Sequence, residues 1–556
     1  MVPGGNLEAA ASRWREVLGA DRVTTDPDHF GRFGSSTLAE SASPVAVVRA
    51  MTTEEVVTVV GIARECGVPL YPVSQGRNWG YGDACPVGPG QVVLDLSGMN
   101  RIIEVDPDLA YAVIEPGVTQ AQLSAHLEEL DCGLISSCTG SSPDASVIGN
   151  LIERGFGPTR YSEHAAHACG LEVVLADGTL LRTGMAGYAG SPSAHVYRWG
   201  LGPSLDGLFS QSNLGIVVRA GVWLMPKPEA LTSFSLEIET DDDLERAIDQ
   251  LRRLRLQGTL TGPVFISNVY RTLAQIGRFP WHETEGETPL RREVAETLVR
   301  RRGQPGMGGR YNAIGAVQGT RRSVDAALHD VGEALDGTGT LTLTSTEDVD
   351  RFERRGLELS EAPASAEQGR QMVAMAEVAR AGLAVFAGVP SDQALAISRW
   401  RLRSPVTGPC VDPAAEGCGL YWVAPVCPAK GSEVRACMRL IEDRVLRDGF
   451  EPLIRIALVT DRSVLLTTLL AFDRRHPEEG RAARACHRDL TAALIEAGYP
   501  PYRAGVDEMD LLDHQGSAQW SVVAALKQAL DPEGVLAPGR YEPAVAAALH
   551  RAPEAP

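Results

Sequence analysis

The stretch PLYPVSQGRNWGYGDACP, residues 69–86, decides the fold. Its apolar start is typical of a short strand, and the glycine-rich turn that follows brings backbone N–H groups close together, which fits either a bound diphosphate or a plain turn. A second strand is predicted at 91–97. Upstream, residues 46–50 predict a strand, and Thr52 to Glu55 fit a capping box at the start of a helix that ends at Gly67. The chain therefore starts with an alternating β-α-β pattern.

The next part of the chain has the pattern of antiparallel strands joined by turns. Residues 101–117 and 169–182 each predict a hairpin, the second with Asp177-Gly178 at its turn. Between them, residues 133–160 form a second segment that is dense in Gly, Ser and Pro. A further strand is predicted at 215–225.

The sequence changes character after Pro226, and we predict a domain boundary there. Longer amphipathic helical segments follow, and 300–310 are expected to form an exposed loop. Strands at 419–426 and 453–459 are predicted on either side of a helix at 431–447. The glycine-rich turn near the C-terminus could rejoin the first domain.

The composition is that of a soluble protein of several domains. Among its 556 residues, 71 are acidic and 52 are basic, so the net charge is −19, which disfavours nucleic acid as a partner. We expect no signal peptide, since charges at Glu8, Arg13, Arg15 and Glu16 interrupt the N-terminus, and no membrane span, since no stretch approaches roughly 18 uncharged apolar residues. The ten cysteines include no CxxC pair, so we expect no zinc ribbon and a cytoplasmic location.

Familiar nucleotide, metal and hydrolase motifs are missing from the sequence. The stretch Gly155-Phe156-Gly157 lacks the third glycine of GxGxxG, so a Rossmann site is disfavoured. No GxSxG occurs, which makes a hydrolase the weaker class. His164 and His167 are three residues apart, but no carboxylate or cysteine motif accompanies them, and a structural role is favoured over a metal site.

Three residues far apart in the sequence suggest an anion site. Tyr81 lies in the first glycine-rich turn, and Tyr502 and Arg503 are adjacent. Two phenol O–H donors and a guanidinium stabilise a phenolate oxygen, provided that the fold brings them together.

Longer motifs resemble, in consecutive order, those of the vanillyl-alcohol oxidase and p-cresol methylhydroxylase flavoproteins. The dense part of the resemblance comprises residues 69–86, VIGNLIERGFGPTRYSEH (147–164), CGLEVVLADGTLLRTGM (169–185) and GPSLDGLFSQSNLGIVVRAGVWLMPKP (202–228). A looser part comprises APVCPAKGSE (424–433), AGYPPYRAGVDEMD (497–510) and DPEGVLAPGR (531–540).

This resemblance implies an α+β fold with a two-part FAD-binding domain of the vanillyl-alcohol oxidase type and an intervening α+β cap domain. The FAD-binding domain would comprise 1–226 and the returning segment 498–556, and the cap would comprise 227–497. By motif position, the residues expected to contact FAD are Ser74, Gln75, Gly76, Arg77 and Asn78 along the diphosphate, and Gly149, Asn150, Gly155, Ile216, Val217 and Arg540 elsewhere.

The resemblance also implies a reaction. The family oxidises 4-substituted phenols by hydride transfer from the benzylic carbon to flavin N5, and it holds the phenolate with two tyrosines and an arginine. By motif these are Tyr81, Tyr502 and Arg503. The electron acceptor would be O2 or a separate cytochrome c, because this chain has no CxxCH haem motif. A homodimer or higher homo-oligomer is expected.

The family often links FAD covalently through a His or Tyr, and here the matching stretch is EGCGLYWVAP (416–425), which has no His. Leu420 or Tyr421 occupies the position, so a tyrosyl link at Tyr421 and a non-covalent FAD both stay open. Cys138 is a second candidate anchor, as a flavin thioether, and a buried thiol is its alternative.

The surroundings of flavin N5 also differ from the family pattern. Ser141 stands where the oxidases have an Asp, and the glutamate base of the hydroxylase branch is replaced near Ile456, with Arg455 adjacent. These departures leave two alternatives to phenol oxidation. One is a flavin enzyme for a different alcohol, hydroxy acid or natural-product scaffold, and the other is a redox-inert FAD-binding protein.

Overall fold

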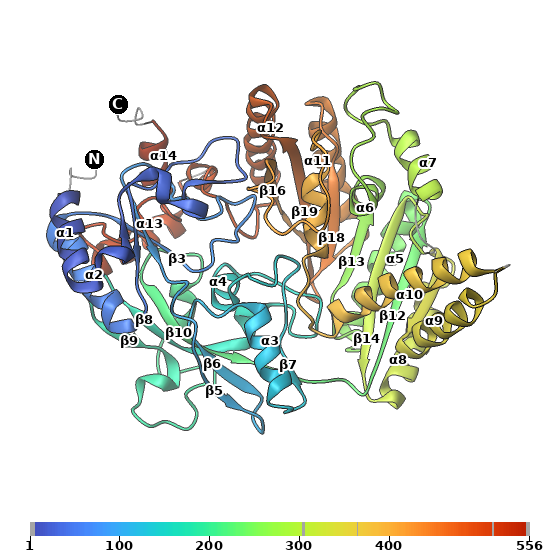
Figure 1. Ribbon diagram of the computed structural model, residues 1–556, viewed down its shortest axis with the longest axis horizontal. Helices are drawn as coiled ribbons and strands as arrows, with labels where there is room; N and C mark the ends of the chain where they lie inside the picture. The colour runs from blue at the N-terminus through green and yellow to red at the C-terminus, as the bar shows by residue number, and fades with distance from the viewer. Residues whose placement is uncertain (1–5, 303–305, 364, 514–515, 552–556) are drawn as a thin grey trace.

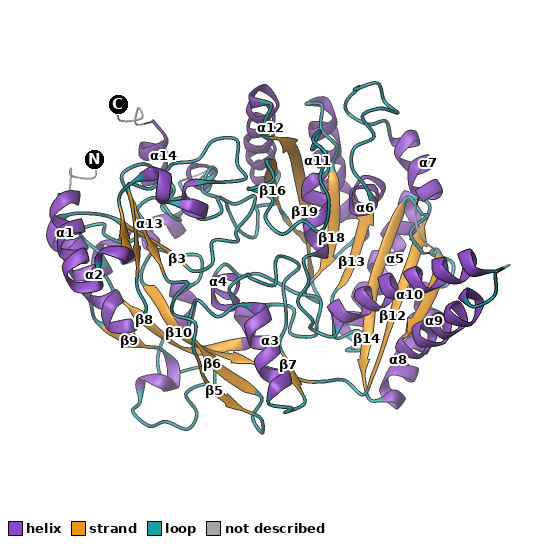
Figure 2. Cartoon of the chain, viewed as in Figure 1, coloured by secondary structure: helices purple, strands orange, loops and turns teal. Residues whose placement is uncertain are grey.

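The computed structural model describes residues 6–302, 306–363, 365–513 and 516–551. Two halves lie side by side in Figure 1, with the first part of the chain on the left and the middle part on the right. Each half is built on sheets covered by helices, as the secondary-structure colours in Figure 2 show. Within the described ranges, no helix combines the length and the apolar character that crossing a bilayer requires.

The first sheet contains the predicted β-α-β start. Its strands, in spatial order, are β1 (Val23–Thr24), β2 (Ala46–Arg49), β4 (Val92–Asp95) and β3 (Leu70–Val73), with β2, β4 and β3 parallel. Helix α2 (Thr53–Cys66) connects β2 to β3, and its N-terminus is capped by Thr52, which accepts a hydrogen bond from Glu55 N at 3.2 Å. The Glu55 carboxylate binds Met51 N instead of completing the predicted capping box.

The second sheet is antiparallel and contains both predicted hairpins. Its strands, in spatial order, are β5 (Ile102–Asp106), β6 (Tyr111–Ile114), β10 (Ile216–Trp223), β8 (Ala168–Val174) and β9 (Leu180–Arg182). Val174 pairs with Leu180 across the Asp177-Gly178 turn, where Gly178 has φ +86°. Helices α3 (Gln120–Glu129) and α4 (Val147–Ile152) lie between these strands in the sequence.

The large sheet of the second half is antiparallel. Seven of its strands, in spatial order, are β15 (Thr340–Ser345), β12 (Ala230–Ile238), β14 (Tyr311–Gly319), β13 (Val264–Asn268), β18 (Leu453–Leu458), β19 (Ser463–Asp473) and β16 (Cys418–Val423), and β17 (Val426–Pro428) pairs with β19. The main helices of this half are α5 (Asp241–Leu256), α6 (Val269–Ile276), α7 (Arg292–Arg302), α8 (Arg321–Leu335), α9 (Thr346–Ser360), α10 (Ala366–Phe386), α11 (Gly431–Arg447) and α12 (Pro477–Glu496). The predicted loop at 300–310 starts later than expected, because α7 continues to Arg302, and residues 303–305 lie outside the described residues.

The two faces of this large sheet have different partners. Because successive strand side chains alternate between faces, Ile454, Ile456 and Leu458 of β18 pack with α5, α11 and α12 in one apolar core. Their neighbours Arg455 and Ala457 therefore lie on the opposite face. Helix α6 packs on that opposite face, where Leu273 joins a cluster that also contains Trp79 of the first half.

The C-terminal part of the chain returns to the first sheet. Leu536 forms a parallel bridge with Leu70 of β3, and Ala537 N donates to Leu70 O at 2.7 Å. At the end of α13 (Ala518–Leu530), the buried Lys527 Nζ contacts Asp531 and donates to Asn213 O. A terminal helix, α14 (Pro543–Arg551), follows. We retain the division at 226 and 498 as our proposal for the domain boundaries.

Candidate active site

The two glycine-rich segments meet at the point where β3 ends. A Cβ atom at Gly149 would lie 2.5 Å from Ser74 Oγ, so the lack of a side chain at Gly149 helps α4 to approach the first turn this closely. Gly76 has φ +67°. Within the described part of the chain, the backbone N–H groups of 74–78 donate to no acceptor. Unsatisfied N–H groups in a turn of this kind suit the diphosphate of FAD.

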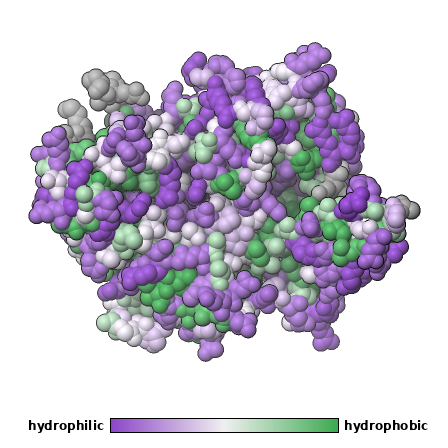
Figure 3. Space-filling view, in the orientation of Figure 1, coloured by the Kyte–Doolittle hydropathy of each residue, from purple (hydrophilic) through white to green (hydrophobic). Residues whose placement is uncertain are grey.

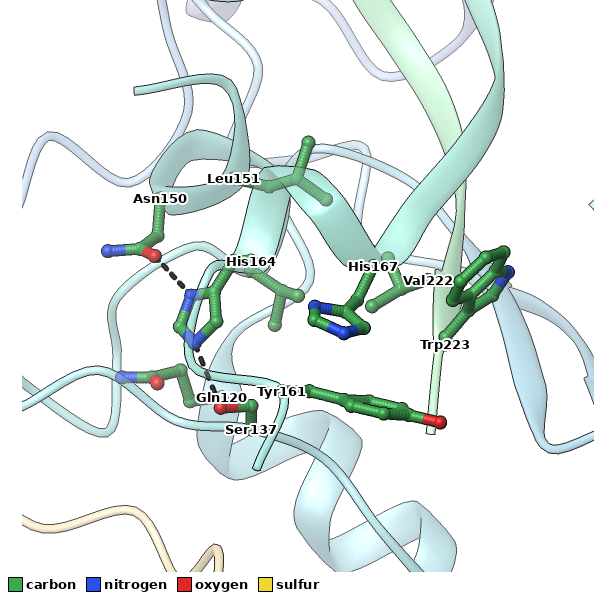
Figure 4. Close-up of a pocket in the computed structure, with 10 residues that line it drawn as sticks. Gln120, Ser137, Asn150, Leu151, Tyr161, His164, His167, Val222 and Trp223 are labelled. Atoms are coloured by element: carbon green, nitrogen blue, oxygen red, sulfur yellow. Dashed lines mark hydrogen bonds between the residues drawn. The ribbon is translucent and has the colours of Figure 1, made fainter. Parts of the chain in front are cut away.

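Asn150 follows Gly149 on α4, and its side chain lies beside the His164 ring (Figure 4). The His164 ring binds Asn150 Oδ1 through Nδ1 at 2.5 Å and Ser137 Oγ through Nε2 at 3.0 Å. Burial lowers the pKa of His164 to about 4, so the ring is neutral at pH 7. A Cβ atom at Gly155 would lie 2.1 Å from Asn150 Oδ1. His164 thus fixes the orientation of the Asn150 amide, which agrees with the predicted structural role.

The three residues of the predicted anion site come together. Arg503 Cζ lies 4.0 Å from the centre of the Tyr81 ring, and the Arg503 side chain donates to Asn78 Oδ1 in the first turn. Val506 N donates to Tyr81 O at 3.0 Å, which ties the C-terminal segment to the glycine-rich turn. Tyr502 N donates to Ala424 O, also at 3.0 Å. The trio therefore lies where the FAD-binding half meets the cap half.

The charges of this trio favour an anionic ligand. Burial raises the pKa of Tyr81 well above its usual value, and the nearby Tyr502 phenol raises it further, so Tyr81 stays a hydrogen-bond donor at neutral pH. Burial alone would lower the pKa of Arg503, but Tyr502, Tyr81 and Glu153 together raise it. Arg503 Nε has no acceptor among the described residues. A permanent cation with a free N–H can bind an incoming oxygen anion.

Glu153 is a part of the site that the sequence did not predict. Its carboxylate pairs with Arg540 and lies 4.0 Å from the Arg503 Nη2. Burial would raise the pKa of Glu153, but Arg540 and Arg503 outweigh burial and lower it. Arg540 also donates to Tyr71 Oη at 2.8 Å. The sequence offered one signal: Glu153 lies in a segment dense in glycine, and a glutamate that is buried there needs a cationic partner.

Ile216 and Val217 occupy successive positions on β10 and so face opposite sides of the second sheet. Ile216 packs with the apolar core around the first sheet, whereas Val217 joins the cluster that contains α4. Of the two, Val217 is the residue whose side chain lies in the same cluster as α4.

Cys138, Ser141 and Arg77, which the sequence also predicted, have surroundings of their own. Cys138 Sγ donates to Gly388 O at 3.1 Å, and burial raises its pKa to about 11, so it is a neutral thiol. Ser141 is partly buried in the 133–160 segment. Arg77 contacts Asp412 of the cap at 3.2 Å.

The structure does not bring Tyr421 to the glycine-rich turn. Its ring stacks against Phe472 and His487 in the core under α12, and its hydroxyl accepts from Ala39 N at 3.1 Å. The next residue, Trp422, lies on the other face, where a Cβ atom at Gly80 would lie 2.4 Å from its Cδ1. Leu420 shares that face with Trp422. A shift of one residue along a strand reverses which face a side chain occupies, and sequence alignment left this one-residue choice open.

Comparison with known proteins identifies the fold and the cofactor. Residues 44–184 match the FAD binding domain family. The chain is 38% identical to 1'-carboxy-chondrochloren decarboxylase of Chondromyces crocatus over 96% of this chain and 97% of that protein. It is 32% identical to the 4-cresol dehydrogenase [hydroxylating] flavoprotein subunit of Pseudomonas putida over 97% and 96%.

A solved structure agrees with these sequence matches. The 4-ethylphenol oxidase from Gulosibacter chungangensis, in its isoeugenol complex, superimposes with a TM-score of 0.84 at 29% identity, covering 97% of this chain and 98% of that one. The predicted α+β fold with a FAD-binding domain and a cap is thereby confirmed, as is FAD as the cofactor. The chain belongs to the vanillyl-alcohol oxidase and p-cresol methylhydroxylase family of FAD-dependent oxidoreductases.

Proposed function

We propose that the protein oxidises a para-substituted phenol, with the phenolate oxygen held by Tyr81, Tyr502 and Arg503. The observation that carries this proposal is the convergence of these residues from 81 and 502–503, with Arg503 Cζ 4.0 Å from the Tyr81 ring. Ionising the phenol pushes electron density toward the para position, and this lowers the barrier to loss of hydride from the benzylic carbon. Bound FAD supplies the acceptor for that hydride at its N5.

The chain's own residues do the binding and orienting. The two tyrosines and Arg503 stabilise the phenolate. Glu153 keeps Arg503 in place and leaves its Nε–H free to donate a hydrogen bond. The backbone of 74–78 and the open approach at Gly149 fit the FAD diphosphate. Asn150, Gly155, Val217 and Arg540 complete our proposed cofactor contacts.

An anaerobic titration of the holoenzyme with 4-ethylphenol tests this proposal. The oxidised flavin spectrum should bleach, and Tyr81→Phe should slow the bleaching about tenfold or more because one phenolate donor is lost. The matched control is Tyr499→Phe, which removes a phenol that binds Glu433 instead. Bleaching by a 2-hydroxy acid and by no phenol would replace phenols as the substrate class. No bleaching by 4-ethylphenol, by 3-(4-hydroxyphenyl)propanoate or by a 2-hydroxy acid would favour a redox-inert role.

A second candidate is oxidation coupled to decarboxylation, and the relative from Chondromyces crocatus favours it. For a substrate ArCH2CHRCO2−, hydride leaves the benzylic carbon, and the electrons of the C–CO2 bond then restore the aromatic ring. The products are ArCH=CHR, CO2 and the two-electron-reduced cofactor. Release of CO2 in equal amount to cofactor reduction distinguishes this reaction from simple phenol oxidation.

The electron acceptor and the assembly are proposals as well. O2 is one acceptor, in line with the oxidase from Gulosibacter chungangensis, and a separate cytochrome c is the other, in line with the Pseudomonas putida flavoprotein subunit. Peroxide formation with O2 alone supports an oxidase, whereas turnover only with a dye or cytochrome supports a dehydrogenase.

We also propose a homodimer or higher homo-oligomer located in the cytoplasm, with the mass in solution as the test of assembly. The surface view in Figure 3 shows apolar side chains in several separate patches.

A further inference from the structure

Two arginines lie on the face of the large sheet that is turned toward the phenol trio. Arg455 is on β18, opposite Ser267 of β13 and Thr467 of β19, and its Cζ lies 5.6 Å from the centre of the Phe265 ring. Phe265 belongs to an apolar cluster against which Tyr502 packs. Arg455 therefore borders the same region as the Tyr502 ring.

Arg271 reaches this region from helix α6. Its Cζ lies 5.3 Å from the centre of the Trp422 ring, and Trp422 contacts Gly80, the residue that precedes Tyr81. The backbones that carry the two arginines are neighbours, because Arg455 pairs with Ser267 across the sheet, and the next residue, Asn268, caps α6 by accepting from Arg271 N at 2.9 Å. The pair thus connects the cap side of the site to the glycine-rich turn.

Among the described residues, no carboxylate pairs with Arg271 or Arg455. Arg271 is 5% exposed, yet its Nε and Nη1 meet no acceptor in the described part of the chain, and the same holds for Arg455 Nε. Buried arginines elsewhere in this half are paired. Arg401, which is 3% exposed, binds both Glu451 and Glu479.

Two adjacent cations, one buried and one half-buried, are unfavourable unless an anion joins them. Burial lowers the pKa of Arg271 well below its usual value, and Arg455 lowers it further, while burial lowers the pKa of Arg455 to about 10. Removing one partner of a buried ion pair is strongly destabilising because a charge is left uncompensated, so a fold keeps such groups where a ligand supplies the partner. A guanidinium presents a planar pair of N–H donors that matches a carboxylate.

We propose that Arg271 and Arg455 bind a carboxylate on the para side chain of the substrate. The proposal rests on the proposed function, since Arg503 would take the phenolate at the opposite end. Phe265 and Trp422 lie beside the two arginines, Tyr502 packs against the cluster of Phe265, and such aromatic surfaces suit an aryl group. The preferred substrate is then a 4-hydroxyphenyl compound that carries a carboxylate, and a neutral alkylphenol such as 4-ethylphenol is a weaker ligand of the same site.

Equilibrium binding to the oxidised holoenzyme tests this site apart from turnover. The probes are 4-hydroxycinnamate and its amide, which have the same shape and no saturated benzylic carbon, followed by the change in flavin absorbance or by calorimetry. We expect the wild type to bind the carboxylate about tenfold or more tightly than the amide. Arg271→Met and Arg455→Met should each bring that ratio toward one and leave the Kd of the amide within about twofold.

The control variant is Arg462→Met, an exposed arginine of the cap that pairs with Asp461, and it should keep the wild-type ratio. The carboxylate site is overturned if the wild type binds 4-hydroxycinnamate and its amide equally well, or if the double Met variant keeps the wild-type preference. The measurement on the wild type decides even if a variant fails to fold. If the variants instead lose FAD while the fraction that retains it keeps the wild-type preference for the carboxylate, that result would assign Arg271 and Arg455 to cofactor binding. Failure of the proposed function gives a different result: Tyr81→Phe would then leave the Kd of both probes unchanged.

Discussion

The two ends of the candidate site hold their arginines in different ways. At the FAD-binding end, Arg503 has the Asn78 amide as an acceptor and the Glu153 carboxylate at 4.0 Å. At the cap end, Arg271 and Arg455 have no carboxylate within the described residues, although the chain carries a net charge of −19. Within the described residues, none of the acidic side chains that make the chain negative pairs with these two cations.

This difference indicates what each end can bind. A compensated cation with one free N–H can accept a phenol that ionises on binding, because the site is stable before the ligand arrives. An uncompensated pair gains most from a ligand that is already an anion. The FAD-binding end thus suits the family's general chemistry, and the cap end suits a particular substrate.

Arg503→Met should break the FAD-binding end and give the largest effect. The phenolate loses its cation in a buried site, so the rate constant for anaerobic flavin reduction should fall by about 10²–10³. Stopped-flow absorbance of the holoenzyme measures this rate constant. A loss of less than about threefold would mean that Arg503 does not hold the phenolate.

Glu153→Gln should make the FAD-binding end resemble the cap end. Arg503 and Arg540 both lose their carboxylate, at a cost of about 3 kcal/mol in the free energy of unfolding, with a Kd for phenols changed by about tenfold. Denaturant unfolding of the holoenzyme and ligand titration measure the two quantities. Unchanged stability would show that Glu153 does not compensate these cations. Arg64 provides the comparison, because its pair with Glu533 is exposed and Glu533→Gln should change little.

Thr467→Asp makes the converse change and gives the cap end a carboxylate of its own. Thr467 faces Arg455 across β18 and β19, so an aspartate there can pair with it. The preference for 4-hydroxycinnamate over its amide should fall about tenfold, because the ligand then competes with a resident anion. Thr467→Asn has the same size without the charge and should keep the preference. Equal loss in both variants would point to steric disturbance of β19.

Much of the fold followed from local sequence pattern. The hairpin of β8 and β9 was predicted because alternation and an Asp-Gly turn set its register within a few residues. The site was different: the chemistry of Tyr81, Tyr502 and Arg503 suggested an anion site and the family resemblance gave it a role, but no local pattern shows that residues so distant in the chain meet. The bond from Val506 N to Tyr81 O is what joins them.

Two features could not be predicted for physical reasons. The unpaired state of Arg271 and Arg455 is a missing tertiary contact, and a missing contact leaves no trace in the sequence near either residue. The face on which Tyr421 lies depends on strand parity, so an alignment uncertain by one residue could not decide between it and its neighbour. In both cases the deciding information is the packing of the large sheet.

Tyr421→Phe should give the smallest effect and compares the two faces of β16. The hydroxyl accepts from Ala39 N on the face away from Gly80, so its loss should cost about 1 kcal/mol of stability and leave the flavin attachment unchanged. Acid precipitation measures the attachment, because a covalent flavin stays in the pellet and a free one enters the supernatant. If the pellet is yellow for the wild type and colourless for the variant, Tyr421 is the anchor, and β16 must turn its other face toward the flavin. The same partition in both proteins leaves Leu420 and Trp422 as the side chains that face the glycine-rich turn, and neither can form a tyrosyl link.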